Sequence, residues 1–126
     1  MPHLDVVDET FLVVPPKVVA AVFAEPAGWR RFWPDLDLEV YADRGDEGFR
    51  WTVRGALTGT MEVWLEPMLD GTLLHYFLRA DLPGQHRPRD LRRELTRRQL
   101  AAKALALELK FALEDGRAPG CAPTVP

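Results

Sequence analysis

The chain has 126 residues, 47% of them hydrophobic and 28% charged, with a net charge of −3, which is typical of one globular domain. No apolar run approaches the roughly 20 residues needed to span a bilayer, and the acidic start MPHLDVVDET does not resemble a signal peptide. Serine and asparagine are absent, the three histidines are scattered, and no glycine-rich phosphate-binding motif occurs. We therefore expect a cytoplasmic protein without a transmembrane segment, serine-hydrolase chemistry, a metal or a cofactor.

The first third of the chain predicts one strand followed by two short helices. Residues 5–13 are rich in β-branched and apolar side chains, and Pro15-Pro16 ends this strand and starts a helix over residues 16–24. The segment GWRRFWPDL, residues 28–36, forms the second short helix and holds Trp29, Phe32 and Trp33. We expect this aromatic segment to cover the mouth of a curved sheet.

The middle of the chain predicts four further strands. Apolar and polar side chains alternate over residues 36–42, 49–54, 57–66 and 72–81, and turn signals such as Asp70-Gly71 separate these runs. Consecutive hairpins of this kind build an antiparallel sheet. Trp64 is an exception on the polar face of its strand. If it lies exposed beside Phe77 and Leu73, it marks a surface for a homodimer.

The last part of the chain predicts one long helix over residues 88–115. A buried stripe is expected at Leu91, Leu95, Ala102, Leu105, Leu109 and Leu113, and we expect Leu100, Ala104, Leu107 and Phe111 to widen it. Residues 1–117 then form a single domain. Residues 118–126 form a flexible Pro-rich tail whose only cysteine, Cys121, cannot build a disulfide framework.

This order of elements resembles the helix-grip fold of the START-like superfamily, also called SRPBCC, which includes polyketide cyclase/dehydrase-like proteins. The stretch VVPPKVVAAVFAEPAGWRRFWPDL is similar to the entry segment of that superfamily. The resemblance implies an α+β fold in which a curved antiparallel sheet of about five strands wraps on the C-terminal helix. It also implies a hydrophobic cavity for lipids, sterols, polyketides or aromatic ligands. Family members usually have six strands after the short helices, whereas residues 36–81 hold about four, so the cavity is expected to be smaller or vestigial.

The sequence hypothesis that follows is a module that binds a hydrophobic or aromatic small molecule, lipid-like or polyketide-like, with or without a negative charge. The ligand is expected between the sheet and the long helix. Phe32 and Trp33 are the predicted gate, and the candidate lining residues are Trp51, Met61, Val63, Tyr76, Leu105 and Leu109.

Two alternatives stay open. The first is an enzyme of the cyclase or dehydratase kind that uses Tyr76 or His75 with Arg79, because a histidine titrates near neutral pH and a phenol can orient a carbonyl. Neighbours on a strand point to opposite faces, so Tyr76 and His75 cannot line one cavity, and the sequence favours a binding protein over an enzyme. The second is a non-catalytic interaction protein that docks a partner through its Trp64 face or its arginines.

Six arginines gather in RPRDLRRELTRRQL against two acidic residues, while the chain up to His86 has 7 basic and 14 acidic residues. The simplest explanation is that these arginines lie on a solvent-exposed helix face and form ion pairs with acidic residues of the rest of the chain. An anionic group on a ligand, an acidic partner or an anionic membrane surface would also satisfy it, with Arg92, Arg93 and Arg97 as candidate anion-binding residues. A pI near 5.6 and the lack of interleaved aromatics argue against nucleic acid.

Overall fold

The described part of the chain folds into a five-stranded antiparallel sheet with its α-helices on one face. The computed structural model describes residues 2–114. The strands lie in the order β1-β5-β4-β3-β2, and each neighbouring pair is antiparallel. This confirms the expected α+β fold with two short helices after the first strand. In chain order the elements are β1 (Leu4–Leu12), α1 (Pro16–Phe23), α2 (Pro26–Phe32), β2 (Leu36–Asp43), the 3-10 turn η1 (Gly45–Glu47), β3 (Gly48–Gly55), β4 (Thr58–Met68), β5 (Gly71–Asp81) and α3 (Pro88–Glu114).

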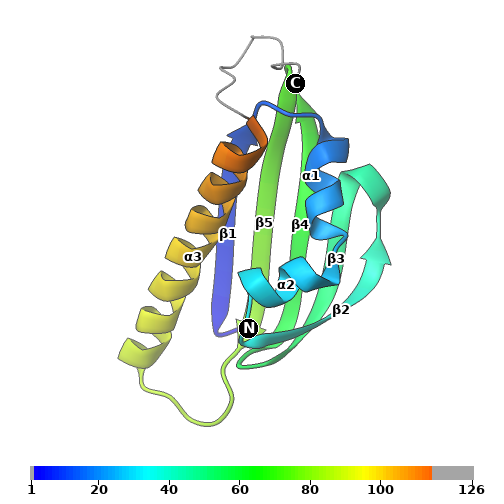
Figure 1. The fold of residues 1–126 in the computed structure, drawn as a ribbon. Helices are drawn as coiled ribbons and strands as arrows, with labels where there is room; N and C mark the ends of the chain where they lie inside the picture. Colours follow the sequence, from blue (N-terminus) through cyan, green and yellow to red (C-terminus); the bar gives the residue numbers. More distant parts are fainter. Residues whose placement is uncertain (1, 115–126) are drawn as a thin grey trace.

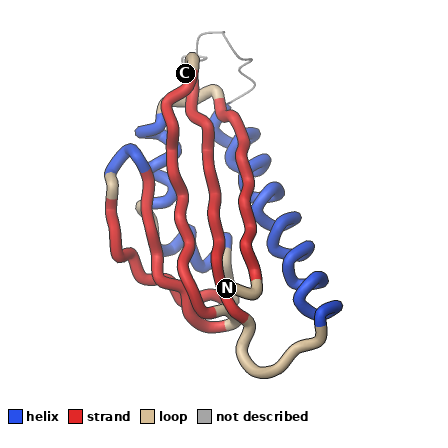
Figure 2. Tube along the Cα trace, turned by 180° about the vertical axis from the view of Figure 1, so that it is seen from behind, coloured by secondary structure: helices blue, strands red, loops and turns tan. Residues whose placement is uncertain are grey.

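The helices divide the covered face of the sheet between them (Figure 1). α3 runs along β1, at one edge, and α1 and α2 lie over the strands toward the other edge. Seen from behind, the opposite face of the sheet carries no helix of residues 2–114 (Figure 2). The strand alternation matches these layers, because Leu4, Val6 and Leu12 are buried under α3 while Asp5 and Val7 are exposed.

Aromatic side chains fill the space between the sheet and the helices. Trp51 on β3 is fully buried, and its ring centroid lies 5.7 Å from that of Trp29 and 5.9 Å from that of Trp33. Phe23 of α1 lies 6.5 Å from Trp51, and Phe49 lies 5.8 Å from it. A fully buried tryptophan contributes about 4–6 kcal/mol from its apolar area alone. We call these five residues the aromatic cluster, and it occupies the place where the resemblance implied a cavity.

Helix α3 begins at a proline, which suits the first helical position because its missing N–H has no partner there in any helix. The Asp90 carboxylate accepts a hydrogen bond from the Arg87 backbone N–H at 3.2 Å, which satisfies one donor at the helix start. At the other end, the Glu114 carboxylate accepts from the Val13 backbone N–H at 2.8 Å. The start of the helix is therefore fixed by a local hydrogen bond, and its end by a long-range one to the segment that follows β1.

One part of the helix prediction is wrong. Leu100, Leu107 and Phe111 do not widen the buried stripe but are 67%, 40% and 81% exposed, and Ala104 is exposed as well. The sheet covers only one side of α3, where Ala102 and Leu109 are buried together with Ala106. A second apolar side of the helix therefore remains uncovered by residues 2–114.

The expected Pro-rich tail at residues 118–126, its Cys121 and the domain boundary at residue 117 lie outside the described residues. Among the helices of residues 2–114, none combines the length and hydropathy needed to cross a membrane.

Gly48 lies where the backbones of β3 and β4 come so close that only glycine fits, and its substitution tests this. Its φ of 121° is in the region that favours glycine, and a Cβ there would overlap the carbonyl oxygen of Val63 on the neighbouring strand. We expect Gly48→Ala to lower the free energy of unfolding by about 3 kcal/mol or more in urea titration. Gly84→Ala is the matched control, since Gly84 has a φ of 76° but open space around it, and about 1 kcal/mol is expected. Equal losses for the two variants would contradict the steric explanation.

Candidate functional site

A groove between α2, the turn that follows it, and α3 is the candidate site. Its volume is about 360 Å³, within the range of small-molecule pockets. The turn supplies one wall, β5 the floor and α3 the other wall. The lining residues are Phe32, Trp33, Pro34, Asp35, Tyr76, Arg97, Arg98, Ala101 and Ala102.

The floor and one wall are aromatic. The rings of Trp33 and Tyr76 are nearly parallel, with centroids 6.2 Å apart and 9° between their planes. The Tyr76 hydroxyl donates a hydrogen bond to the Met61 Sδ at 3.2 Å. Burial raises the pKa of Tyr76, and the charge of Arg98 and a hydrogen bond with Trp33 oppose this only in part. The phenol is therefore uncharged at neutral pH.

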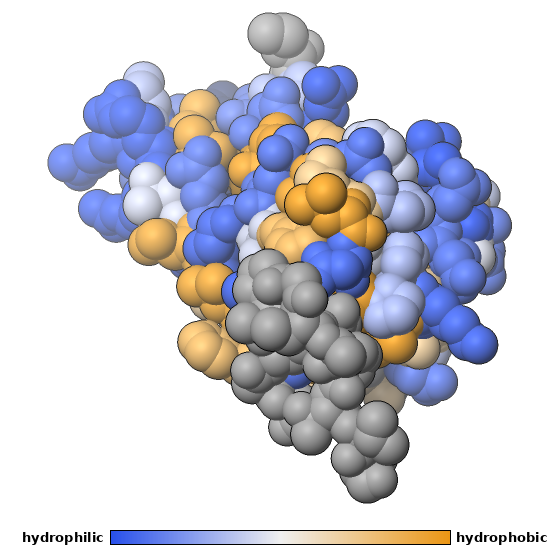
Figure 3. Space-filling model, turned by 90° about the horizontal axis from the view of Figure 1, so that it is seen from above, coloured by the Kyte–Doolittle hydropathy of each residue, from blue (hydrophilic) through white to orange (hydrophobic). Residues whose placement is uncertain are grey.

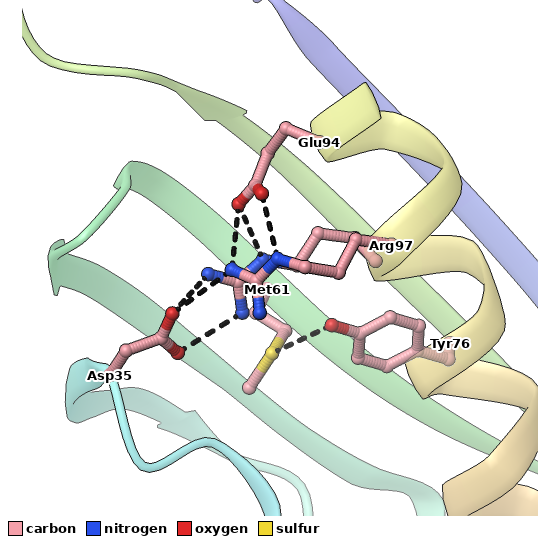
Figure 4. Close-up of polar contacts among 6 residues, drawn as sticks. Asp35, Met61, Tyr76, Glu94 and Arg97 are labelled. Atoms are coloured by element: carbon pink, nitrogen blue, oxygen red, sulfur yellow. Dashed lines mark hydrogen bonds and ion pairs between the residues drawn. The ribbon is translucent and has the colours of Figure 1, made fainter. Parts of the chain in front are cut away.

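Four charged residues form the rim of the groove, and Figure 4 shows their hydrogen bonds. The Arg98 guanidinium is only 6% exposed and donates through Nη2 and Nη1 to the two Asp35 oxygens, at 2.6 and 3.2 Å. Its Nε donates to Glu94 at 3.1 Å. Arg97 donates through Nε to Glu94 at 2.8 Å and through Nη2 to Asp35 at 3.2 Å. We call these residues the rim network: two cations and two anions that hold the α2–β2 turn against α3.

The pKa shifts follow from these contacts. The hydrogen bond from Arg97, followed by the charges of Arg98 and Arg97, outweighs partial burial and lowers the pKa of Glu94. Burial acts to raise the pKa of Asp35, but the hydrogen bonds and charge of Arg98, with help from Arg97, lower it overall. The hydrogen bond to Glu94 raises the pKa of Arg97 further. Asp35, Glu94 and Arg97 therefore carry their charges at neutral pH, and the rim network pairs two guanidinium groups with two carboxylates.

A second, more open hollow continues the groove along α3. Its volume is about 460 Å³, and it shares Phe32 and Ala101 with the first. The Arg31 guanidinium on α2 forms an ion pair with Glu108 on α3 at 3.0 Å, so charges are paired here as well. Ala104 and Leu105 complete its apolar lining. The two hollows are adjacent and mainly apolar, and we call them together the channel between the helices.

The predicted ligand-binding residues are divided between this channel and the core. Phe32, Trp33 and Tyr76 line the groove, and Leu105 lines its continuation. Trp51, Met61, Val63 and Leu109 are buried in the core on the same side of the sheet and line neither hollow of the channel.

Sequence reasoning missed Asp35, Arg98 and Ala101. One signal was available, because Arg98 stands four, seven and eleven residues before Ala102, Leu105 and Leu109, on the same side of the helix. An arginine in an apolar stripe must be paired if it is buried.

The candidate catalytic residues do not share a site. Tyr76 faces the helices, whereas His75 and Arg79 lie on the opposite face of the sheet, as their alternation requires. His75 lies between Glu9 and Glu66, at 3.4 and 3.0 Å, and its ring stacks on that of Trp64 with centroids 4.2 Å apart. Trp64, Leu73 and Phe77 are half-buried on this open face.

The candidate anion-binding arginines also differ from one another. Arg97 belongs to the rim network, while Arg92 and Arg93 are exposed and pair with no carboxylate of residues 2–114. In the same part of the chain, no group of three or more His, Cys, Asp or Glu side chains is placed to hold a metal ion.

A long helix packed on a curved antiparallel sheet, after a first strand and two short helices, is the helix-grip fold that the sequence resemblance predicted. No family model matches the sequence, and no curated protein matches it significantly. Similar solved structures include the Aha1 dimer from Colwellia psychrerythraea, with a TM-score of 0.67 and 14% identity over 91% of this chain and 99% of that one. Mll3558 from Rhizobium loti has a TM-score of 0.59 and 19% identity over 83% and 96% of the two chains.

A third similar structure is StfQ, a di-domain ARO/CYC from the steffimycin biosynthetic pathway. It has a TM-score of 0.62 and 17% identity, and the match covers 90% of this chain but 51% of StfQ. This chain therefore corresponds to about half of that di-domain protein. At these identities the likeness establishes the fold.

The rim network is testable by replacing one carboxylate. We expect Asp35→Asn to lower the free energy of unfolding by about 2 kcal/mol, because the buried Arg98 guanidinium loses its two-oxygen partner. Asp37→Asn, two residues along at an exposed position, is the matched control and should change stability by less than about 0.5 kcal/mol. Urea unfolding at neutral pH measures both, and similar losses would show that the Arg98 pairing is not responsible.

The lowered pKa values predict an acid dependence with a definite sign. Asp35 and Glu94 bind protons less readily in the folded than in the unfolded chain, so their contribution is present above about pH 4 and is lost as the pH falls through the lowered values. Between about pH 5 and about pH 2, Glu94→Gln should therefore lose less stability than the unsubstituted protein. Glu39→Gln, at an exposed strand position, should keep the original slope. Parallel slopes for Glu94→Gln and the unsubstituted protein would contradict the assignment.

Proposed function

We propose that the protein binds an uncharged, flat aromatic or similarly hydrophobic small molecule in the channel between α2 and α3. The observation that carries the proposal is an apolar groove of about 360 Å³ with an aromatic floor and a rim whose charges are already paired. The planes of Phe32 and Trp33 are 78° apart, so a flat ring would stack on the half-buried Phe32, contact Trp33 without stacking on it, and lie against Ala101 of α3. Such a ligand requires no movement of the aromatic cluster beneath it.

The rim network argues for a ligand without charge. Both guanidinium groups at the groove already bind carboxylates, so an anion would have to displace Asp35 or Glu94 from Arg97 and Arg98. A charged ligand would also lose its hydration without gaining a free partner. Of the two versions of the sequence hypothesis, the uncharged ligand is therefore the better supported.

Binding is better supported than catalysis. Of the candidate catalytic residues, Tyr76 alone reaches the groove, and its hydroxyl donates to a thioether rather than to a base. StfQ, which has this fold, is an ARO/CYC of a biosynthetic pathway, and this supports the aromatic character of the ligand without assigning its reaction to this chain.

Titration calorimetry with 2-naphthol, an uncharged two-ring probe, tests the proposal. We expect Ala101→Leu to weaken binding about 10-fold, because the added carbons occupy the channel. Ala112→Leu makes the same change at an exposed position of the same helix, outside both hollows, and should bind like the unsubstituted protein.

The charge of the probe provides the second arm of this experiment. The anion 2-naphthoate has the same ring system and should bind at least about 10-fold more weakly than 2-naphthol. Undetectable binding of 2-naphthol, or equal binding by the Ala101→Leu and Ala112→Leu variants, would contradict the assignment of the channel. Tighter binding of 2-naphthoate would contradict the uncharged class of ligand.

A further inference from the structure

The solvent-facing side of α3 carries an apolar stretch in its second half. Leu100, Leu107 and Phe111 are spaced by seven and four residues, so they lie on one side of the helix, opposite to the side that packs on the sheet. Phe111 is 81% exposed and Leu100 is 67% exposed. At the end of the molecule where α3 finishes, hydrophobic side chains reach the surface among hydrophilic ones (Figure 3).

The first turns of the same helix, with the residue just before it, carry unpaired positive charge. Arg87, Arg89, Arg92 and Arg93 are exposed, and none of them forms an ion pair with a carboxylate of residues 2–114. Cations at this end of a helix are unfavourable because they lie near the positive end of the helix dipole. The carboxylates of the described residues therefore leave these four arginines without an ion pair, whereas Asp35 pairs with Arg97 and Arg98 one turn further along α3.

The charged and apolar parts lie in one line along the helix. Arg89 and Arg93 precede Leu100 by eleven and seven residues, which places all three on the same side as Leu107 and Phe111. We call this surface the outer face of α3, and it consists of Arg89, Arg92, Arg93, Leu100, Leu107 and Phe111.

We propose that the outer face of α3 binds the surface of an anionic lipid bilayer. The arginines would contact lipid phosphates and carboxylates, and Leu100, Leu107 and Phe111 would enter the boundary between headgroups and acyl chains. The binding of a helix to such an interface increases with the apolar area that it buries and with the attraction between its basic side chains and anionic lipids.

Other occupants satisfy only part of this surface. Two copies of α3 packed in parallel would bring their arginines together. In the antiparallel arrangement, the acidic groups in the second half of the described helix are Glu108 and Glu114, which already pair with Arg31 and Lys110. A nucleic acid would neutralise the arginines but would offer nothing to the exposed Phe111 side chain. A bilayer with anionic lipids supplies partners for both halves.

Vesicle flotation with the full chain tests the proposal. We expect binding to phosphatidylcholine vesicles that contain about 30 mol % phosphatidylserine, weak binding to phosphatidylcholine alone, and release as salt is raised from about 0.1 M to about 0.5 M. The combined variant Arg89→Gln, Arg92→Gln and Arg93→Gln should lower partitioning at least about 10-fold. Lys17→Gln, Arg30→Gln and Arg54→Gln together are the matched control, since they remove the same charge from exposed positions on other elements.

The apolar half has its own pair of variants. Phe111→Ser should lower partitioning about 10-fold, and Leu69→Ser, which alters a side chain that is 94% exposed in the β4–β5 turn, should leave it unchanged. All variants are at exposed positions, and urea unfolding verifies that they remain folded.

Three outcomes would overturn the proposal. The first is no flotation with the phosphatidylserine vesicles. The second is equal partitioning of either variant and its control. The third is a stable dimer in light scattering that Phe111→Ser dissociates, because a second copy would then cover the outer face. None of these results bears on the 2-naphthol titration, which uses no membrane.

Discussion

The burial of Trp51 is the constraint on which the arrangement of the helices depends. The sheet has four strands after the short helices, and the concave space that it encloses is filled by this indole and the rings around it. Protein interiors are packed about as densely as organic crystals, so a filled space of this kind leaves no room for a ligand of similar size. The channel therefore lies at the edge of the aromatic cluster, in the hollows that the side chains of α2 and α3 leave between them.

The buried guanidinium of Arg98 is the second constraint. A cation with 6% exposure must be paired, and the partners available are Glu94 one turn earlier on α3 and Asp35 on the α2–β2 turn. Asp35 is 62 residues from Arg97 and 63 from Arg98 in sequence. The ion pairs between them therefore fix the position of α3 relative to the α2–β2 turn. The same contacts determine that the rim of the channel is neutral.

The sequence predicted the elements because side-chain alternation and helical spacing depend only on local geometry. Alternation also placed Tyr76 and His75 on opposite faces, as observed. It did not distinguish a ligand cavity from a filled core, since Trp51, Met61 and Val63 would show the same pattern in either case. That distinction depends on how much volume the sheet encloses and on how five aromatic rings pack, which are properties of the whole fold.

The exposed side of α3 illustrates a related limit. Leu100 and Phe111 are residue types that usually lie in a protein core. Their burial would require a second layer of structure over the outer side of α3, and residues 2–114 provide none. The ion pair between Asp35 and Arg98 could not be predicted from the sequence either, because residue spacing does not show which turn contacts a helix 63 residues later.

The four tryptophans lie on both faces of the sheet. The rings of Trp29 and Trp33 lie against Trp51 on the helix side. Trp64 lies on the other face against the imidazole of His75. A change in packing at the helices therefore acts directly on the surroundings of the first three indoles, and a change on the opposite face acts directly on those of Trp64, so tryptophan fluorescence responds to both faces of the unlabelled chain.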